Sequence, residues 1–323
     1  MTPTRRAVAF LPLALLAAAA HAGAPFPSKP ITLIVASAPG GTTDISARLL
    51  AEPLGKALGQ TIVVDNRAGA SGAIAAVAVK RAEADGHTLL MQYSGYHVIT
   101  PVVSKHSLGW EAKDLQPVAN VLTAPQVVVV RAGLPIKSMA ELIAYAKANP
   151  GKLTYASSGN GSLQHVTGAM LEQQAGIQMT HIPYKGTGPA LQDLLGAQVD
   201  LTFGTPPPFM PHIQSGKLHA LAVTSGTRVA SLPDIPTTAE AGLPRLNPTS
   251  WFAVFAPAAT PKPVVDMLAA EIGRVMATPE FKKKAADLGA AADYLSPAQL
   301  GELAQADLKR WAEVAKASKI QAD

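Results

Sequence analysis

One strand, glycine turn and helix near the start of the chain constrain its fold more than any other feature. Residues 31–37 are apolar and rich in β-branched side chains, which is typical of a buried strand. Residues 43–58 carry apolar side chains at helical spacing, and Pro53 is expected to kink or shorten this helix. Gly40 and Gly41 lie between the two and let the backbone turn tightly. The pattern predicts an α/β protein with a helix N-terminus at the end of a buried strand.

Such a helix N-terminus suits an anion. Its first N–H groups have no partner within the helix, and the helix dipole adds roughly half a positive charge there. Thr42 and Thr43 could cap the helix or donate hydroxyl groups to the same guest. The alternative is an ordinary turn in which Asp44 balances the dipole. A nucleotide is disfavoured, because the turn lacks both the Lys-Ser/Thr pair of a phosphate-binding loop and the spacing of a dinucleotide fingerprint.

The first 22 residues have the features of a secretory signal peptide. Two arginines precede the apolar run 7–20, and the sequence AHA at 20–22 provides a small-x-small cleavage site. The run is too short to span a bilayer, and no other segment approaches the ~20 apolar residues that a spanning helix needs. We expect the mature protein to begin near Gly23 and to reside in the periplasm.

Charge and cysteine content exclude several classes of protein. Without the two arginines of the signal peptide, 25 basic residues face 22 acidic ones, a net charge of about +3. This weak charge, with no basic tract interleaved with aromatic residues, argues against nucleic acid as a partner. The chain has no cysteine, so disulfides and thiolate metal sites are excluded and stability must come from a buried core.

The mature chain is predicted to form two α/β units. The chain passes from the first unit to the second and back, and we call these two connections the crossings. Strand-like and helical segments alternate from 31 to 93, and a second series begins at 126, which predicts parallel sheets with helices on both faces. Three helices, at about 262–277, 279–289 and 297–317, have no sheet of their own and should pack on the first unit. Two crossings form a hinge. The predicted organisation is a signal peptide at 1–22, a discontinuous domain 1 at 23–124 and 251–323, and domain 2 at 125–250.

No catalytic constellation or metal site emerges from the sequence. Ser162 lacks the spacing of a Gly-x-Ser-x-Gly nucleophile elbow and is better explained as a helix cap. His165, His181, His212 and His219 have no metal-ligand spacing and are interpreted as structural. His165 lies one turn into a helix that follows a second glycine turn, so it could face a ligand. We expect neither an enzyme nor a metal or other cofactor.

Seven motifs follow one another along the mature chain. They are APGGTTDISAR at 38–48, LGQTIVVDNRAG at 58–69, DGHTLL at 85–90, YAKANPGKL at 145–153, HIPYKG at 181–186, LAVTS at 221–225 and LPDIPT at 232–237. Together they resemble the Bug family, the extracytoplasmic solute receptors of tripartite tricarboxylate transporters. The resemblance implies a two-domain periplasmic-binding-protein (Venus flytrap) fold. It also implies a small carboxylate held by backbone N–H groups, hydroxyls and ordered waters.

The resemblance further implies where the ligand binds. Loops matching 38–44, 69–73 and 158–165 supply candidate residues, which are Pro39, Gly40, Gly41, Thr42, Thr43, Asp44, Ser71, Gly72, Ser158, Gly159, Asn160, Ser162 and His165. Two departures from the family's pattern bear on the ligand. Gly204, next to Thr205, stands where the family usually carries Asp, and Tyr93 and Tyr96 stand where small residues are usual. Space at Gly204 walled by the two tyrosines would favour an aromatic or longer dicarboxylate, unless the tyrosines face the core.

We therefore expect a periplasmic solute-binding protein, acting as a monomer, that captures a small organic carboxylate by domain closure. Membrane transporter subunits would be its partners. One alternative is a ligand-sensing receptor for a signalling partner, which needs the same closure. Another is an exported α/β enzyme, which would require a base, a nucleophile or a metal in the cleft.

Overall fold

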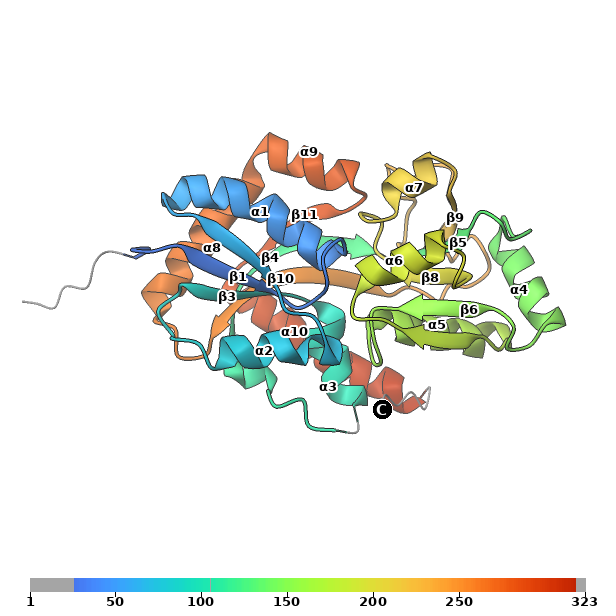
Figure 1. Cartoon of the computed structure of the whole chain (residues 1–323), viewed down its shortest axis with the longest axis horizontal. Helices are drawn as coiled ribbons and strands as arrows, with labels where there is room; N and C mark the ends of the chain where they lie inside the picture. Colours follow the sequence, from blue (N-terminus) through green and yellow to red (C-terminus); the bar gives the residue numbers. More distant parts are fainter. Residues whose placement is uncertain (1–25, 105, 318–323) are drawn as a thin grey trace, which may run out of the picture.

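The protein forms two α/β lobes that lie side by side, each built on one sheet (Figure 1). The computed structural model describes residues 26–104 and 106–317. The signal peptide predicted at 1–22 lies outside the described residues. Within the described ranges, no helix is long and apolar enough to cross a membrane.

The sheet of the first lobe, sheet 1, has six strands in the order β11-β4-β10-β3-β1-β2. Their bounds are β1 (Ile31–Val35), β2 (Ile62–Asn66), β3 (Thr88–Tyr93), β4 (Leu115–Pro125), β10 (Thr249–Pro257) and β11 (Ala291–Leu295). β1 pairs in parallel with both β2 and β3, so the parallel arrangement expected for this part of the chain is confirmed. β10 pairs antiparallel with β3 and β4, and β4 pairs antiparallel with β11.

The sheet of the second lobe, sheet 2, has five strands in the order β7-β6-β8-β5-β9. Their bounds are β5 (Val127–Arg131), β6 (Thr154–Ser157), β7 (Thr180–Pro183), β8 (Leu201–Gly204) and β9 (Leu218–Val223). β6 is parallel to β7 and β8, whereas β5 is antiparallel to β8 and β9.

The expectation of parallel sheets is therefore only half right, and the chain crossings explain why. The turns after β1 and β7 meet between the lobes, where the Ala38 N–H donates to the Lys185 carbonyl at 3.2 Å. Strands that end at this interface run in one direction within their sheet. β5 and β10 begin at the interface and carry the chain away from it, so they must run the opposite way.

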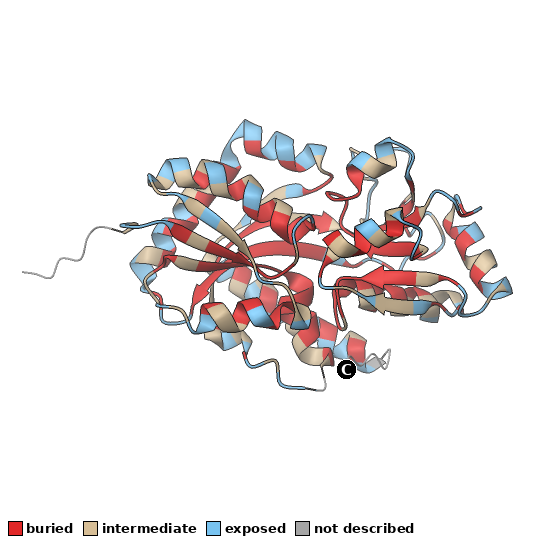
Figure 2. Cartoon of the chain, viewed as in Figure 1, coloured by how far each residue is buried: buried red, intermediate tan, exposed pale blue. Residues whose placement is uncertain are grey.

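Helices cover both faces of each sheet, as predicted (Figure 1). α1 and α8 lie on one face of sheet 1 and α2 and α10 on the other, while α4 and α5 lie opposite α6 and α7 on sheet 2. The bounds are α1 (Thr42–Leu58), α2 (Ala73–Lys80), α3 (Thr100–Val103), α4 (Met139–Ala148), α5 (Leu163–Ala175), α6 (Thr187–Leu195), α7 (Met210–Gln214), α8 (Lys262–Ala277), α9 (Pro279–Asp287) and α10 (Pro297–Ala317). Figure 2 shows the buried residues along the strands and on the inward faces of these helices.

The shortening expected as one alternative at Pro53 is not observed, because α1 runs from Thr42 to Leu58 through it. Proline removes one intrahelical hydrogen bond. Ala47, Leu50 and Leu54 of the same helix are buried in the core of the first lobe. Tertiary packing of this kind supplies most of the stability of a helix in a protein, so α1 tolerates the lost bond.

The three C-terminal helices pack on the first lobe, as expected. Buried side chains of α8 and α10, among them Leu268 and Leu300, belong to the same core as the strands of sheet 1. The Trp251 indole N–H of β10 also donates to the Asp307 carboxylate of α10 at 2.8 Å. Residues 262–317 therefore complete the lobe that the first strands of the chain begin.

The chain passes between the lobes at Gln126, the one residue between β4 and β5, and again between β9 and β10. Thr224, directly after β9, fixes Gln126 from both sides. The Gln126 N–H donates to the Thr224 hydroxyl at 2.8 Å, and the Thr224 N–H donates to the Gln126 carbonyl at 2.9 Å. The Thr224 hydroxyl in turn donates to the Pro248 carbonyl at 2.6 Å, just before β10. The segments that connect the lobes are thus bonded to one another.

Candidate functional site

A narrow cavity of about 20 Å³ lies between the two lobes. It is lined by Ser37, Gly41, Thr42, Thr43, Tyr93, Tyr96, Gln126, Ser158, Gln164, Gly186, Thr187, Thr205, Ser250 and Phe252. None of these side chains is an Asp, Glu, Lys or Arg. A cavity of this size holds about one water molecule. A dicarboxylate can therefore enter only when the lobes separate.

The start of α1 forms one wall of the cavity. Gly41 is the N-cap residue of α1, so Thr42 and Thr43 begin the helix, and the expectation that they could cap it is wrong. All three residues line the cavity. The first N–H groups of an α-helix have no hydrogen-bond partner within the helix itself. The Thr205 hydroxyl, from the other lobe, bonds to the Thr42 hydroxyl at 2.6 Å. This wall offers N–H and hydroxyl donors without a charged side chain.

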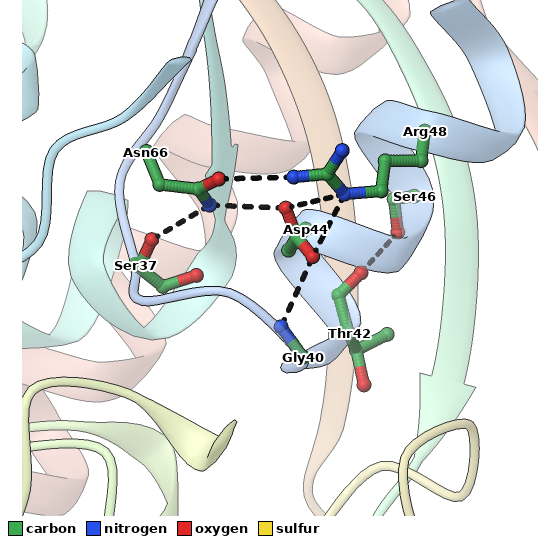
Figure 3. Close-up of polar contacts among 7 residues, drawn as sticks. All are labelled: Ser37, Gly40, Thr42, Asp44, Ser46, Arg48 and Asn66. Carbon is green, nitrogen blue, oxygen red and sulfur yellow. Dashed lines mark hydrogen bonds and ion pairs between the residues drawn. The ribbon is translucent and has the colours of Figure 1, made fainter. Parts of the chain in front are cut away.

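Asp44 does not line the cavity but holds the turn in shape from behind (Figure 3). Its carboxylate accepts from the Gly40 N–H at 3.0 Å, from Arg48 Nε at 3.0 Å and from Asn66 Nδ2 at 3.0 Å. The same Asn66 amide donates to the Ser37 carbonyl at 3.0 Å (Figure 3). The Asp44 carboxylate is thus occupied by these partners. Asp44 lies in the first turn of α1, where its charge balances the helix dipole.

The second predicted turn contributes Ser158 to the cavity, and the helix after it, α5, is capped by its own serine. Ser162 is the N-cap of α5 and accepts from the His165 N–H at 3.3 Å, which confirms its interpretation as a cap. The Tyr93 hydroxyl of the first lobe lies 3.0 Å from Ser158 Oγ. This contact joins the first lobe to the turn before α5.

Two tyrosines line the cavity on the side of the first lobe and also belong to the core of that lobe. The Tyr96 hydroxyl donates to the Ser158 carbonyl at 2.5 Å, and the Tyr93 and Tyr96 rings meet edge to face at 4.5 Å. Burial raises the pKa of both hydroxyls, that of Tyr96 to about 12. Both therefore remain protonated and neutral at physiological pH.

A third helix N-terminus, which the sequence reasoning did not assign to the site, faces α1 across the cavity. Gly186 is the N-cap of α6, and Gly186 and Thr187 line the cavity. The Gln164 amide fixes Thr187 by donating to its hydroxyl at 2.9 Å, and Gln164 Oε1 accepts from the Ser158 N–H at 3.2 Å. The glycine turn at 185–188 resembles the turn before α1, so this helix N-terminus could have been predicted from the sequence.

The predicted site residues fall into two groups. Those that line the cavity are Gly41, Thr42, Thr43, Tyr93, Tyr96, Ser158 and Thr205. Those that do not are Pro39, Gly40, Asp44, Ser71, Gly72, Gly159, Asn160, Ser162, His165 and Gly204. Cavity residues that the sequence reasoning missed are Ser37, Gln126, Gln164, Gly186, Thr187, Ser250 and Phe252.

Several residues of the second group instead join the lobes next to the cavity. The Ser71 hydroxyl of the first lobe donates to the Asn160 carbonyl of the second at 2.8 Å. Gly72 packs directly under the Tyr96 ring, where an added Cβ would come within 2.6 Å of it. Pro39 lies against Gly188 at the start of α6, and its carbonyl would be 2.0 Å from a Cβ at that position. The Ser71 and Pro39 contacts hold the lobes together beside the cavity, whereas Gly72 supports Tyr96 within the first lobe.

A Ser–His pair lies beneath the cavity. Ser157 Oγ is 2.6 Å from His181 Nε2, and the His181 ring stacks on His165 with ring centroids 4.0 Å apart. Ser157 is fully buried, and none of the three lines the cavity. Ser157 also accepts from the Gly159 N–H at 3.1 Å, so its hydroxyl supports the turn. His165 therefore faces His181 and not the cavity, and the pair does not reach the place where a substrate would lie.

The space predicted beside Gly204 is filled by the Phe209 ring, and this expectation is wrong. A Cβ added at Gly204 would come within 2.5 Å of that ring, and Phe209 is fully buried. The missing side chain at position 204 thus makes room for a core aromatic residue. The ligand gains no extra volume there.

Replacing Gly204 with alanine should lower the stability of the protein. Overpacking of this kind costs typically 1–3 kcal/mol, and we expect a loss of about 2 kcal/mol in urea unfolding. Gly226→Ala is the matched control, because a Cβ there meets no atom within 4 Å. Equal midpoints for the two variants would contradict the account of Phe209.

The two lobes, the narrow cavity between them and the facing helix N-termini define a class of protein, the two-lobed solute-binding proteins. The family model described as "Tripartite tricarboxylate transporter family receptor" matches residues 46–320. The chain therefore belongs to this family of receptors, and the resemblance stated above is confirmed.

Individual proteins agree with this assignment. Protein BugT of Bordetella pertussis is 37% identical over 90% of this chain and 90% of its own length. MatC of Rhodopseudomonas palustris, solved with bound malate, is 33% identical, with a TM-score of 0.85 over 90% of this chain and 99% of its own. An R. palustris protein solved with adipate is 35% identical, with a TM-score of 0.89 over 92% of this chain and 99% of its own.

Proposed function

We propose that this protein captures a small organic dicarboxylate between its lobes and delivers it to the membrane subunits of a tripartite tricarboxylate-type transporter. The observation that carries the proposal is the cavity itself, in which the N-termini of α1 and α6 face one another from opposite lobes. Each N-terminus offers unpaired N–H groups and the positive end of a helix dipole. One carboxylate would bind at each.

The chemistry of the lining supports an organic anion without an amino group. An ammonium group calls for a carboxylate partner, and no Asp or Glu lines the cavity. Tyr93, Tyr96 and Phe252 form an apolar wall, with the Tyr93 and Phe252 rings stacked at 6.0 Å. Such a wall suits the hydrocarbon part of an aromatic or longer dicarboxylate. The relatives solved with malate and adipate bind ligands of this general class.

Closure about the two crossings would complete the site. The domains at 23–124 with 251–323 and at 125–250 would separate to admit the ligand and then close, because the α1 and α6 N-termini belong to different lobes. We further propose that the receptor is exported to the periplasm and acts as a monomer. Intact mass and light scattering of the exported protein test both points: a retained N-terminus would indicate an anchored receptor, and a dimer would contradict the monomer.

Calorimetry with a panel of carboxylates tests the proposal. We expect aliphatic or aromatic dicarboxylates to bind, with aspartate and glutamate much weaker, because no Asp or Glu lines the cavity to balance the charge of their ammonium group. Small-angle scattering should show a smaller radius of gyration at saturation than without ligand. Failure of every carboxylate to bind would refute the proposed ligand class, and an unchanged radius of gyration with a bound ligand would refute closure.

A further inference from the structure

Two buried polar atoms in the cavity wall have no hydrogen-bond partner in the described part of the chain. They are the hydroxyl oxygen of Ser37 and the side-chain oxygen of Gln126. The two residues are only 4% and 2% exposed. A buried polar atom without a partner is costly, and such atoms in a binding site are commonly satisfied by the ligand. The two atoms differ in chemistry, since a hydroxyl can donate to a carboxylate but a carbonyl oxygen can only accept.

The Gln126 side chain is held in one orientation by its neighbours. Its backbone is fixed on both sides by Thr224, and Gln126 Nε2 donates to Ser250 Oγ at 2.8 Å. Ser250 lies on β10, opposite Ala124 of β4. The amide thus joins the two crossings, and Oε1 is the side-chain atom left without a partner in a residue that lines the cavity. Because it lies where the chain passes between the lobes, opening would displace it little.

From this geometry we infer that Gln126 selects ligands that carry a hydroxyl group on the chain between their carboxylates. The inference rests on the proposed dicarboxylate function and narrows its substrate class to hydroxy acids. Carboxylate oxygens at physiological pH only accept hydrogen bonds, so an unsubstituted diacid would leave Oε1 buried and unpaired. A ligand hydroxyl would donate to Oε1 and remove that penalty. A site that hydrogen-bonds a hydroxyl rejects the analogue that lacks it.

Matched ligand pairs that differ by one hydroxyl provide the test. Malate is compared with succinate, and a hydroxyadipate with adipate, by calorimetry on the full-length mature protein. We expect the hydroxylated member of the better-fitting pair to bind roughly 10-fold or more tightly, the usual effect of leaving a buried acceptor unpaired. Methionine has a similar volume to glutamine. Gln126→Met should bring the ratio of the two affinities in a pair close to one, mainly by weakening the binding of the hydroxy acid.

Ser250→Ala gives an independent second variant, which matters because Gln126→Met could also lower stability. It leaves the amide in place but removes the bond that orients it, so the amide can rotate and the ratio should again fall. Gln92→Met is the matched control. Gln92 is a fully buried glutamine whose Oε1 also lacks a partner, but it does not line the cavity. The ratio of affinities within each ligand pair should therefore be the same in Gln92→Met as in the wild type.

The outcomes separate this inference from the proposed function. Equal affinities within each pair in the wild type, or an unchanged ratio in both Gln126→Met and Ser250→Ala, would overturn the inference while leaving dicarboxylate binding intact. Binding of no diacid in either pair would overturn the proposed function as well. A lowered ratio in Gln92→Met would show that the selectivity arises from general loosening of the core, which also overturns the role of Gln126.

Discussion

Replacing Gly188 with alanine should weaken ligand binding by roughly 100-fold without unfolding the protein. A Cβ at this position would lie 2.0 Å from the Pro39 carbonyl of the opposite lobe, so the two must move apart by at least about 1 Å. That shift separates the N-termini of α1 and α6. Loss of two charge-assisted hydrogen bonds, at about 1.5 kcal/mol each, corresponds to roughly 100-fold in affinity.

The loop at Pro39 has little freedom to yield instead. The neighbouring Gly40 N–H is bonded to Asp44, and the Ala38 N–H is bonded to Lys185 of the second lobe. Alanine is favoured over glycine in a helix, and the clash can be relieved by parting of the lobes, so each lobe of the variant should stay folded. Calorimetry would measure the affinity, thermal unfolding the stability and scattering the degree of closure.

The helical variant Gly301→Ala is the control for Gly188→Ala. A Cβ at Gly301, on α10, comes no closer than 3.8 Å to another residue, so its affinity should match the wild type. Wild-type affinity and normal closure in Gly188→Ala would contradict this prediction. They would show that the start of α6 does not contact Pro39 in the ligand-bound protein.

The stability of the protein should fall steeply as the pH is lowered from 6.5 toward 3, and His97 should cause much of this fall. His97 is 2% exposed and stacks on Phe255 with ring centroids 4.1 Å apart. Burial lowers the pKa of His97 to about 3, against about 6.5 in an unfolded chain. Within this window the unfolded state binds the proton and the folded state does not. The contribution of buried, neutral His97 to the free energy of unfolding is therefore complete above pH 6.5. It is lost on acidification, by about 3 kcal/mol at pH 4.

Urea unfolding between pH 4 and 7 measures this effect. His97→Gln, which cannot take up the proton, should flatten the pH dependence by about that amount. Burial also lowers the pKa of His181 to about 3 and that of His165, so part of the slope should remain. His106→Gln, at an exposed position, is the control and should keep the wild-type slope. An unchanged slope in His97→Gln would show that this histidine is not buried as described.

Local pattern predicted most of the elements but not their direction in the sheets. The strand at 31–37, the glycine turn and the helix after it depend on neighbouring residues, and the structure confirms all three. The direction of β5 and β10 depends instead on where the chain crosses between lobes, which no short-range pattern encodes. Pro53 shows the same limit, because core packing of α1 outweighs the local preference of proline.

The site was predictable where one short segment builds it and not where distant segments meet. Gly41, Thr42 and Thr43 follow from a single turn. Gln126 and Ser250 are 124 residues apart and meet only because both lie at crossings, so neither looked special in the sequence. The filling of Gly204 by Phe209 likewise requires the position of a ring five residues away to be known.

A cavity without charged side chains also affects how the ligand is released. In a site built on an arginine, the anion would stay paired with that residue after the lobes part. If the ligand is held as proposed, by donors on α1 and α6 from different lobes, separation would remove the contacts with one helix and admit water to the other. A transporter subunit that pulls the lobes apart would therefore need no competing charge of its own. Handover would depend on a mechanical step, and its rate should vary little with ionic strength.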